Sequence, residues 1–506
     1  MDFNMTNFVG PLLVVIAFWV FGKGIVNRSR GKTFRPLPAF LLLLVALSFR
    51  FIFDEGSIFE NLAMTLTDFG IGMIIASSYL AFHKERSKLF WVPGALALVI
   101  SAVMHISIAL VKNISDNIFS QPTTVELLVE LGPDDSIDEL KPILKKYKAK
   151  AEKAFENVDI TEDEDLAQTY VVYLDSAYLD PLMKELKMDS ENVDFVERNN
   201  PVNLFEPTPA PVYENNKYPY RANDPYLGSQ WYLEKLDYNH AYDLIKTIKP
   251  AKKVIVAIVD TGVDSDHEDL KGVFESSPGD TDKHSHGTHC AGIAGAETNN
   301  NKGIGSLNWE GKFITILGFP ALDQYGRGSD KTVSKAIIDA AEAGADVISM
   351  SLGGYSPVPP RSQVEAVKYA LSLGSIIVVA AGNSNDNAKR YSPANIPGVI
   401  TVSAVDENLN KAVFSNTNTD AKIKMPIAAP GVNIFSSIPG SKYQAFSGTS
   451  MATPLVAGLI GMMRSFNPDL SPKQAHKILK DTGRKVKDSG KIGYVVDPYQ
   501  ALKALQ

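Results

Sequence analysis

The sequence predicts a chain of three parts: an all-α membrane region, a small α+β domain, and an α/β domain with a doubly wound, mainly parallel sheet. Four long apolar stretches lie before residue 112, and short strand and helix patterns follow up to about residue 205. Near-continuous apolar runs, separated by helical patterns, fill the rest. A chain of 506 residues has room for about two to four domains.

Composition limits the function. The chain is 45% hydrophobic and 21% charged, as in an ordinary globular protein, and its formal net charge is −7. A negative chain has no basic field to attract a polyanion, so we expect no nucleic-acid partner. The single cysteine, Cys290, excludes an intramolecular disulfide framework and leaves the cellular compartment open.

Residues 1–112 are predicted to form four transmembrane helices. A spanning helix needs about 20 apolar residues, which the last two stretches reach and the first two approach. A cleavable signal peptide is the alternative for the first stretch, but Met1–Asn7 contains no Lys or Arg. Buried core helices are the alternative for all four. The stretches are Phe8–Phe21, Pro38–Phe53, Leu62–Phe82 and Phe90–Val111.

Charges between these stretches predict their orientation. The first and third connections are basic, and the second, Asp54–Glu60, is acidic. Because short basic loops stay in the cytoplasm, everything after Val111 is expected outside it. We therefore expect a multi-pass protein of the cell membrane, in contact with the lipid bilayer. The basic residues are Lys23, Arg28, Arg30, Lys32 and Arg35, then Lys84, Arg86 and Lys88.

A small domain is predicted over residues 125–205, after a polar linker at 113–124. Its strand and helix patterns follow the order βαββαβ, which is typical of a ferredoxin-like sandwich. The strands are Val125–Leu131, Ala151–Val158, Thr169–Leu174 and Val193–Val196, and the helices are Ser136–Tyr147 and Tyr178–Lys187. Residues 206–221, within the Pro-, Asn- and Tyr-rich stretch Asn199–Pro225, are predicted to be an extended linker.

The α/β domain is predicted over residues 222–506. Near-continuous apolar runs mark strands that are covered on both faces, as in a parallel sheet. In such a sheet the ligand site lies beyond the carboxyl ends of the strands. The strands are Val254–Val259, Val347–Leu352, Ser375–Ala381 and Val399–Val405, and the helices between them include Ser329–Ala343, Ser362–Leu373 and Thr449–Ser465.

Residues suited to nucleophilic catalysis stand at the ends of these elements. Asp260 ends a strand, His286 opens a helix of small residues, and Ser450 begins another helix. A serine hydroxyl needs an imidazole to take its proton, and the imidazole needs a carboxylate to hold its tautomer. Asn383 ends a third strand, where its amide and the Ser450 N–H could bind an oxyanion. A turn-forming carboxylate is the alternative for Asp260.

Their surroundings resemble the signatures of the subtilisin-like serine proteases, over about residues 224–506. The motifs are Asp260-Thr-Gly, His286-Gly-Thr-His, Ala381-Gly-Asn383 and Gly448-Thr-Ser450-Met-Ala-Thr-Pro. The resemblance implies a subtilisin-like fold and a serine endopeptidase that acts on protein or peptide substrates without an organic cofactor. It makes Asp260, His286 and Ser450 catalytic and Asn383 with Ser450 the oxyanion hole.

Two other functions are weighed against this one. A catalytically silent binding protein could use the same fold as a scaffold. An intramembrane protease or transporter could use Ser101 and His105, which lie four residues apart. No Asp or Glu lies within Phe90–Val111 to orient that imidazole, so the soluble motifs are favoured.

The resemblance also implies where a substrate binds. Gly326, Arg327 and Gly328 would form one edge, and Ser351, Leu352, Gly353 and Gly354 the other, with the substrate backbone between them as an added strand. Glycine at 353 and 354 would leave the specificity pocket open to a large apolar side chain. Turns after strands are the alternative reading of both segments. Arg327 suits either acidic substrate residues or a solvated surface.

Calcium is the ion that the resemblance suggests, bound by Asp269, Asp224 and the loop that begins at Asn299. Solvated turn residues are the alternative. His284, His286 and His289 could suggest a different metal, but the resemblance makes His286 the base and His289 structural. Cys290 is expected to be a buried small hydrophobe beside the active site.

Residues 125–205 resemble the inhibitory propeptide that precedes many subtilisins, in element order and in the terminal strand Val193-Asp-Phe-Val-Glu197. Such a propeptide assists folding and leaves its tail in the active site as a product-like inhibitor. Counting onward as in the family places Phe205 beside the bond that is cut. The parts together predict a membrane-anchored zymogen whose protease is released after processing.

Overall fold

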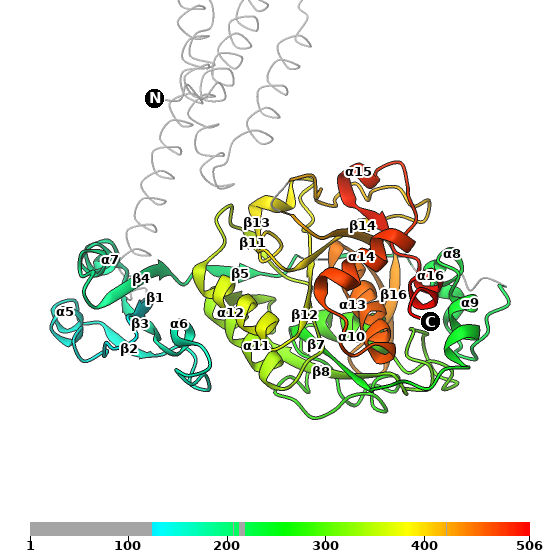
Figure 1. Ribbon diagram of the computed structural model, residues 1–506, viewed down its shortest axis with the longest axis horizontal. Helices are drawn as coiled ribbons and strands as arrows, with labels where there is room; N and C mark the ends of the chain where they lie inside the picture. Colours follow the sequence, from blue (N-terminus) through cyan, green and yellow to red (C-terminus); the bar gives the residue numbers. More distant parts are fainter. Residues whose placement is uncertain (1–123, 206, 212–217, 421–422) are drawn as a thin grey trace, which may run out of the picture. The chain divides into compact units, whose positions relative to one another are not determined.

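The computed structural model describes residues 124–205, 207–211, 218–420 and 423–506 (Figure 1). The four predicted membrane helices and nearly all of the first linker lie outside these residues. Within the described residues, no helix is both long and apolar enough to cross a membrane.

The small domain is a four-stranded antiparallel sheet with the strand order β2-β3-β1-β4. The chain order is β1 (Thr124–Leu131), α5 (Lys141–Lys146), β2 (Lys150–Lys153), α6 (Glu164–Ala167), β3 (Thr169–Asp175), α7 (Leu179–Met188) and β4 (Val193–Arg198). The predicted βαββαβ order is present, with α6 as an additional turn of helix. The first helix is shorter than predicted because residues 137–140 form turns and the helix begins only at Lys141, with Pro142 in its first turn.

Both faces of this sheet are buried. Alternate side chains of a strand point to opposite faces, so Leu127 and Val129 pack with Leu182 of α7 in one cluster. Leu128 and Val171 point the other way and belong to the same buried cluster as the α/β domain. The open face of the sandwich is therefore an interface within the chain.

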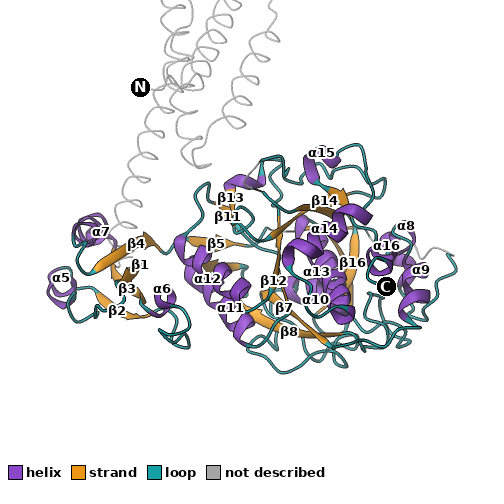
Figure 2. Ribbon diagram, viewed as in Figure 1, coloured by secondary structure: helices purple, strands orange, loops and turns teal. Residues whose placement is uncertain are grey.

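The α/β domain is built on a seven-stranded sheet with the order β18-β15-β14-β12-β10-β7-β8, and every neighbouring pair is parallel (Figure 2). The strands are β7 (Val254–Asp260), β8 (Ile314–Pro320), β10 (Val347–Met350), β12 (Ile376–Ala380), β14 (Ile400–Val405), β15 (Pro426–Pro430) and β18 (Tyr494–Val495). The predicted mainly parallel sheet is confirmed.

Helices cover both faces of this sheet. On one face, Val256 and Ile258 of β7 share a cluster with α10 (His286–Gly295) and α13 (Thr449–Phe466). On the other, Ala257 and Val259 share a cluster with α11 (Asp330–Glu342) and α12 (Arg361–Ser372). Burial on both sides explains why the strand sequences are almost continuously apolar. The carboxyl ends of the strands are left as the place for a site.

The stretch Asn199–Pro225, which contains the predicted extended linker 206–221, is paired with the α/β domain at two points. β5 (Pro201–Asn203) lies antiparallel to β9 (Arg327–Ser329). β6 (Thr208–Ala210) lies antiparallel to β17 (Lys442–Ser447), which also pairs with β16 (Ile434–Ile438). The segment contains extended parts, as the sequence predicts, and two of them, β5 and β6, pair with strands of the domain that follows.

Candidate active site

Asp260 and His286 form a hydrogen-bonded pair at the carboxyl end of β7. Asp260 is the last residue of β7 and His286 the first of α10, and both are buried. Nδ1 of His286 lies 2.7 Å and 2.9 Å from the two carboxylate oxygens of Asp260. An Nδ1–H that donates to a carboxylate leaves Nε2 free to accept a proton.

The charge of Asp260 changes the affinity of the imidazole for a proton. Burial alone would lower the pKa of His286, but the negative charge of Asp260, the neighbouring Cys290 and the hydrogen bond to Asp260 outweigh burial. The pKa of His286 therefore lies well above its ordinary value of 6.5. A base of this kind holds a proton more tightly than a free imidazole does.

Ser450 lies in the first turn of α13, beside the same pair. The Cys290 thiol donates to the Ser450 carbonyl over 3.5 Å, and its sulfur lies 3.9 Å from Nδ1 of His286. The Ser450 hydroxyl donates to the carbonyl of Ser351 over 3.1 Å. Among the described residues, Nε2 of His286 has no hydrogen-bond partner. The serine must rotate toward Nε2 before its proton can be taken.

Two nitrogen atoms that carry hydrogen lie near one point beside Ser450. Oδ1 of Asn383 accepts hydrogen bonds from the backbone N and the hydroxyl of Thr449, at 2.9 Å and 2.8 Å. This fixes the amide so that Nδ2 faces Gly448. A methyl group added to Gly448 would lie 3.2 Å from Nδ2 of Asn383 and 3.6 Å from the backbone N of Ser450. Two converging donors of this kind suit a developing oxyanion.

The two predicted substrate edges lie on either side of one extended segment of the chain itself. Val202 is opposite Gly328 and Asn203 opposite Arg327. On the other side, Leu204 forms an antiparallel bridge with Leu352, while its N–H donates to the Gly326 carbonyl over 2.8 Å. Residues 201–204 therefore occupy the position of an added strand.

Phe205 follows this strand and lies against glycine backbone. A methyl group added to Gly353 would come within 3.0 Å of the Phe205 ring, and one added to Gly382 within 3.4 Å. The ring also meets Tyr391 edge-on, with centroids 6.2 Å apart. Gly354, predicted to border the same pocket, lies in β11 (Gly354–Tyr355) with no atom within 4 Å of an added methyl group. The aromatic contact comes from Tyr391, which no sequence motif identified.

The predicted calcium residues are partly brought together. Asp224 accepts hydrogen bonds from the backbone N of Asn299 and Asn300, at 2.9 Å and 3.1 Å. Asp269 accepts from Nδ2 of Asn300 at 3.2 Å and from the N of Ile304 at 2.8 Å. Burial raises the pKa of both carboxyls, that of Asp224 to about 6. The side chain of Asn299 turns to Glu310 instead, so Asn300 is the amide between the carboxylates.

The three clustered histidines do not converge on one point. His289 stacks on Phe446, with ring centroids 4.5 Å apart, and its Nε2 lies 3.0 Å from the Gln444 carbonyl. Burial lowers the pKa of His289 to about 3, so it stays neutral. It packs α10 against β17, in agreement with a structural role.

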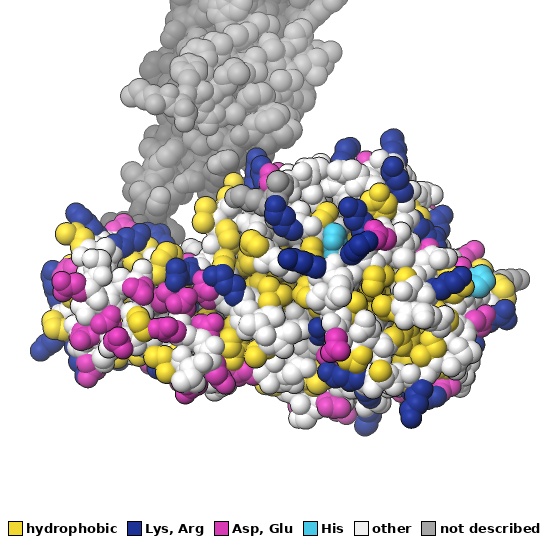
Figure 3. All heavy atoms as spheres, viewed as in Figure 1, with side chains coloured by type: hydrophobic (Ala, Val, Ile, Leu, Met, Phe, Trp, Pro, Cys, Tyr) yellow, Lys and Arg dark blue, Asp and Glu magenta, His cyan; other side chains and the backbone are white. Residues whose placement is uncertain are grey.

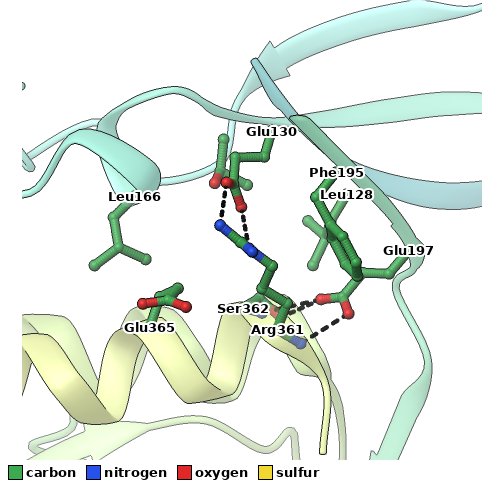
Figure 4. Close-up of a pocket in the computed structure, with 9 residues that line it drawn as sticks. Leu128, Glu130, Leu166, Phe195, Glu197, Arg361, Ser362 and Glu365 are labelled. Carbon is green, nitrogen blue, oxygen red and sulfur yellow. Dashed lines mark hydrogen bonds and ion pairs between the residues drawn. The ribbon is translucent and has the colours of Figure 1, made fainter. Parts of the chain in front are cut away.

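A polar contact that the sequence did not reveal joins the small domain to the start of α12 (Figure 4). Glu197 accepts hydrogen bonds from the backbone N of Arg361 and Ser362, at 2.8 Å and 3.0 Å. A carboxylate there satisfies free N–H groups of the helix and complements its dipole. The Arg361 side chain points the other way and binds Glu130 with two hydrogen bonds, of 2.7 Å and 2.6 Å.

Charge is unevenly distributed around this contact. Figure 3 shows many acidic side chains on the small domain, with Lys and Arg visible on both domains. Asp165 of the small domain and Glu365 of α12 both raise the pKa of Glu130. Arg361 therefore lies among several carboxylates.

Comparison with known proteins agrees with this geometry. Residues 251–494 match the profile of the Subtilase family. Thermitase from Thermoactinomyces vulgaris is 39% identical over 281 residues, covering 54% of this chain and 94% of thermitase. A thermophilic serine proteinase from Bacillus sp. (strain AK1) is 38% identical over 276 residues, covering 52% of this chain and 66% of that protein.

Among solved structures, fervidolysin from Fervidobacterium pennivorans, a keratinolytic enzyme related to subtilisin, matches with a TM-score of 0.63 at 25% identity. That match covers 76% of this chain and 61% of fervidolysin. The high coverage of thermitase and the subtilisin-like sheet together give one conclusion: this chain belongs to the subtilase family and is a serine endopeptidase.

Proposed function

We propose that this protein is a membrane-anchored zymogen whose peptidase domain faces out of the cytoplasm and cleaves peptide bonds through an acyl-enzyme on Ser450. His286 takes the Ser450 proton as general base, and Asp260 holds its tautomer and stabilises the imidazolium. The N–H groups of Asn383 and Ser450 stabilise the oxyanion of the tetrahedral intermediate. His286 then donates its proton to the leaving amine.

One observation carries the zymogen assignment: the chain places residues 201–205 in its own cleft as a substrate would lie. This strand pairs with both glycine-containing edges, and Phe205 lies over Gly353 and Gly382. After residue 206 in the sequence, β6 pairs with β17 of the same peptidase domain. We therefore place the processing cut after Phe205 and infer a preference for large apolar side chains at that position.

The small domain acts as the inhibitor that holds this strand in place. Glu197 binds the start of α12, and Glu130 pairs with Arg361, so the domain is fixed to the peptidase beside the cleft. The fervidolysin match covers a larger share of this chain than thermitase does, which supports a fold relationship beyond the peptidase domain. Partners of the mature enzyme are protein or peptide substrates and its own propeptide.

Calcium is proposed as a structural ion. Asp224 and Asp269 are buried, and both accept hydrogen bonds from the same Asn-rich loop. Their carboxylates offer the hard oxygen ligands that Ca²⁺ prefers. Asn300 lies with them. A bound divalent cation would supply the positive charge that two neighbouring buried carboxylates need in order to stay ionised.

Once the chain is cut after Phe205, the predicted membrane helices would hold the peptidase domain only through its noncovalent contact with the small domain. The predicted membrane helices are continuous with the small domain, so a cut after Phe205 leaves a noncovalent attachment. With a C-terminal tag, wild-type protein is expected to give a soluble fragment on cell fractionation. The variant Ser450→Ala should remain full length in the membrane fraction. Wild-type protein that stays full length in the membrane yet hydrolyses peptides would contradict release.

The inhibitor contact is expected to weaken as pH rises from about 5 to about 7. Burial raises the pKa of Glu130 from 4.5 to about 7, although Arg361 lowers it. Between these pH values Glu130 keeps its proton when the small domain is docked, but it loses the proton when the domain is detached and the carboxyl is exposed. Rising pH therefore favours separation of the small domain from the peptidase. One proton gives at most about a tenfold change in Kd per pH unit.

Titrating the cleaved complex with pH measures this dependence. Glu130→Gln cannot ionise and should flatten the change in Kd. Glu191→Gln, an exposed change on the same domain, should keep it. A Glu130→Gln complex with the wild-type pH dependence would assign the effect to another group.

A further inference from the structure

Asp282 lies in the loop before α10, and its buried carboxylate gathers five hydrogen bonds. Oδ1 accepts from the Thr261 hydroxyl at 3.0 Å and from the backbone N of His284 and Ser285 at 2.8 Å and 3.0 Å. Oδ2 accepts from the backbone N and the hydroxyl of Thr288, at 3.0 Å and 2.7 Å. A carboxylate with this many hydrogen bonds restrains the backbone and side-chain groups that donate them.

The donors belong to the two segments that carry the acid and the base. Thr261 follows Asp260 and donates its own N–H to Oδ1 of Asp260 over 2.8 Å. The Thr261 hydroxyl also accepts from the backbone N of Gly287, which follows His286, at 3.0 Å. Asp282 and Thr261 therefore connect the end of β7 to the first turn of α10.

The backbone at this junction is strained and tightly packed. Ser285, directly before His286, has a φ of 92°, a left-handed conformation that costs a non-glycine residue about 1–3 kcal/mol. A methyl group added to Gly287 would lie 1.9 Å from the carbonyl oxygen of Gly262. Because the backbones touch, a small shift of the 282–285 turn moves the imidazole relative to Asp260.

We propose that Asp282 is a positioning residue for catalysis, whose carboxylate holds the strained turn before His286 and so aligns the imidazole with Asp260. The inference rests on the proposed catalytic roles of Asp260, His286 and Ser450. Asp282 does not reach the reacting atoms and acts through the orientation of His286. A misplacement of about 1 Å in a catalytic group costs roughly 10²-fold in rate.

The test compares the mature enzyme with Asp282→Ala and Asp282→Asn, using a chromogenic peptide and titration of active sites. Asp282→Ala is expected to lower kcat per titrated site by about 10²-fold, with KM nearly unchanged. Asp282→Asn keeps the acceptor for Thr261 and the turn but not that for Thr288, so its loss should be smaller. The low-pH limb of kcat/KM should move to lower pH in Asp282→Ala, because a misaligned imidazole loses part of the stabilisation by Asp260.

Matched variants make the outcomes distinct. Asp280→Asn, an exposed change in the same loop, should behave as wild type. Fewer titratable sites with an unchanged kcat and pH profile would mean that Asp282 only supports folding, and would overturn the proposal. Wild-type kcat in Asp282→Ala would overturn it as well. Ser450→Ala, assayed alongside, tests the catalytic roles separately: activity there would refute the triad, whatever Asp282 does.

Discussion

Replacing Ser450 or His286 by Ala is expected to lower kcat by roughly 10⁶-fold, the loss known for subtilisin when either residue is removed. The hydroxyl is a useful nucleophile only when the imidazole takes its proton, so the two side chains act as one unit. The double variant should therefore be little slower than either single one. Steady-state kinetics measures all three on purified enzyme whose propeptide has been removed in trans by a second protease.

A matched control separates chemistry from folding. His240 is an exposed histidine of α9 (Tyr238–Ile245), and His240→Ala should keep wild-type kcat. Independent losses that multiply in the Ser450→Ala, His286→Ala double variant would mean that the two residues do not share one step. The triad assignment would then be wrong.

Asn383→Ala is expected to lower kcat by roughly 10²–10³-fold with KM nearly unchanged, the effect known for the oxyanion-hole asparagine of subtilisin. Nδ2 of Asn383 lies near the same point as the backbone N of Ser450. A hydrogen bond from this amide stabilises negative charge only once the oxyanion has formed, so it lowers the barrier without changing substrate binding. Stopped assays over a range of peptide concentrations separate kcat from KM.

The matching change Asn408→Ala removes an exposed asparagine and should be silent. A rise in KM at constant kcat for Asn383→Ala would assign this amide to substrate binding in the ground state. The oxyanion would then need another side-chain donor.

The fold could be predicted where burial is complete and the pattern is long. β7 and α13 begin and end within a residue or two of their predicted positions, because each is almost wholly buried and mostly apolar. β8 and β15 were not predicted. β8 contains a glycine and ends in proline, and β15 is five residues long with proline at both ends, so neither offers a strong local signal.

The site could be predicted as a set of residues but not as an arrangement. Asp260, His286, Asn383 and Ser450 stand in motifs, and the structure brings them to one edge of the sheet. The direction of the Ser450 hydroxyl toward Ser351 depends on a rotamer, which no motif specifies. Asn300 replaces Asn299 between the carboxylates because backbone geometry decides which side chain turns inward.

Contacts between distant segments were least predictable. The sequence placed Phe205 near the cut by counting, but β5 on β9 and β6 on β17 depend on pairing over more than a hundred residues. The hydrogen bonds of Arg361 to Glu130 join the two domains in the same way. The five hydrogen bonds to Asp282 come from the turn before α10, from α10 itself and from Thr261 after β7, so its role emerges only after folding.

The measurement that tests the central claim most directly is the N-terminal sequence of the soluble fragment released from wild-type protein, set beside Ser450→Ala. The Phe205 ring lies against Gly353 and Gly382, and we propose that a self-processing enzyme would cut after this residue. We expect the wild-type fragment to begin at Glu206 and the variant to yield none. A fragment with the same start from Ser450→Ala, or a wild-type start elsewhere, would contradict self-processing of the strand bound in the cleft.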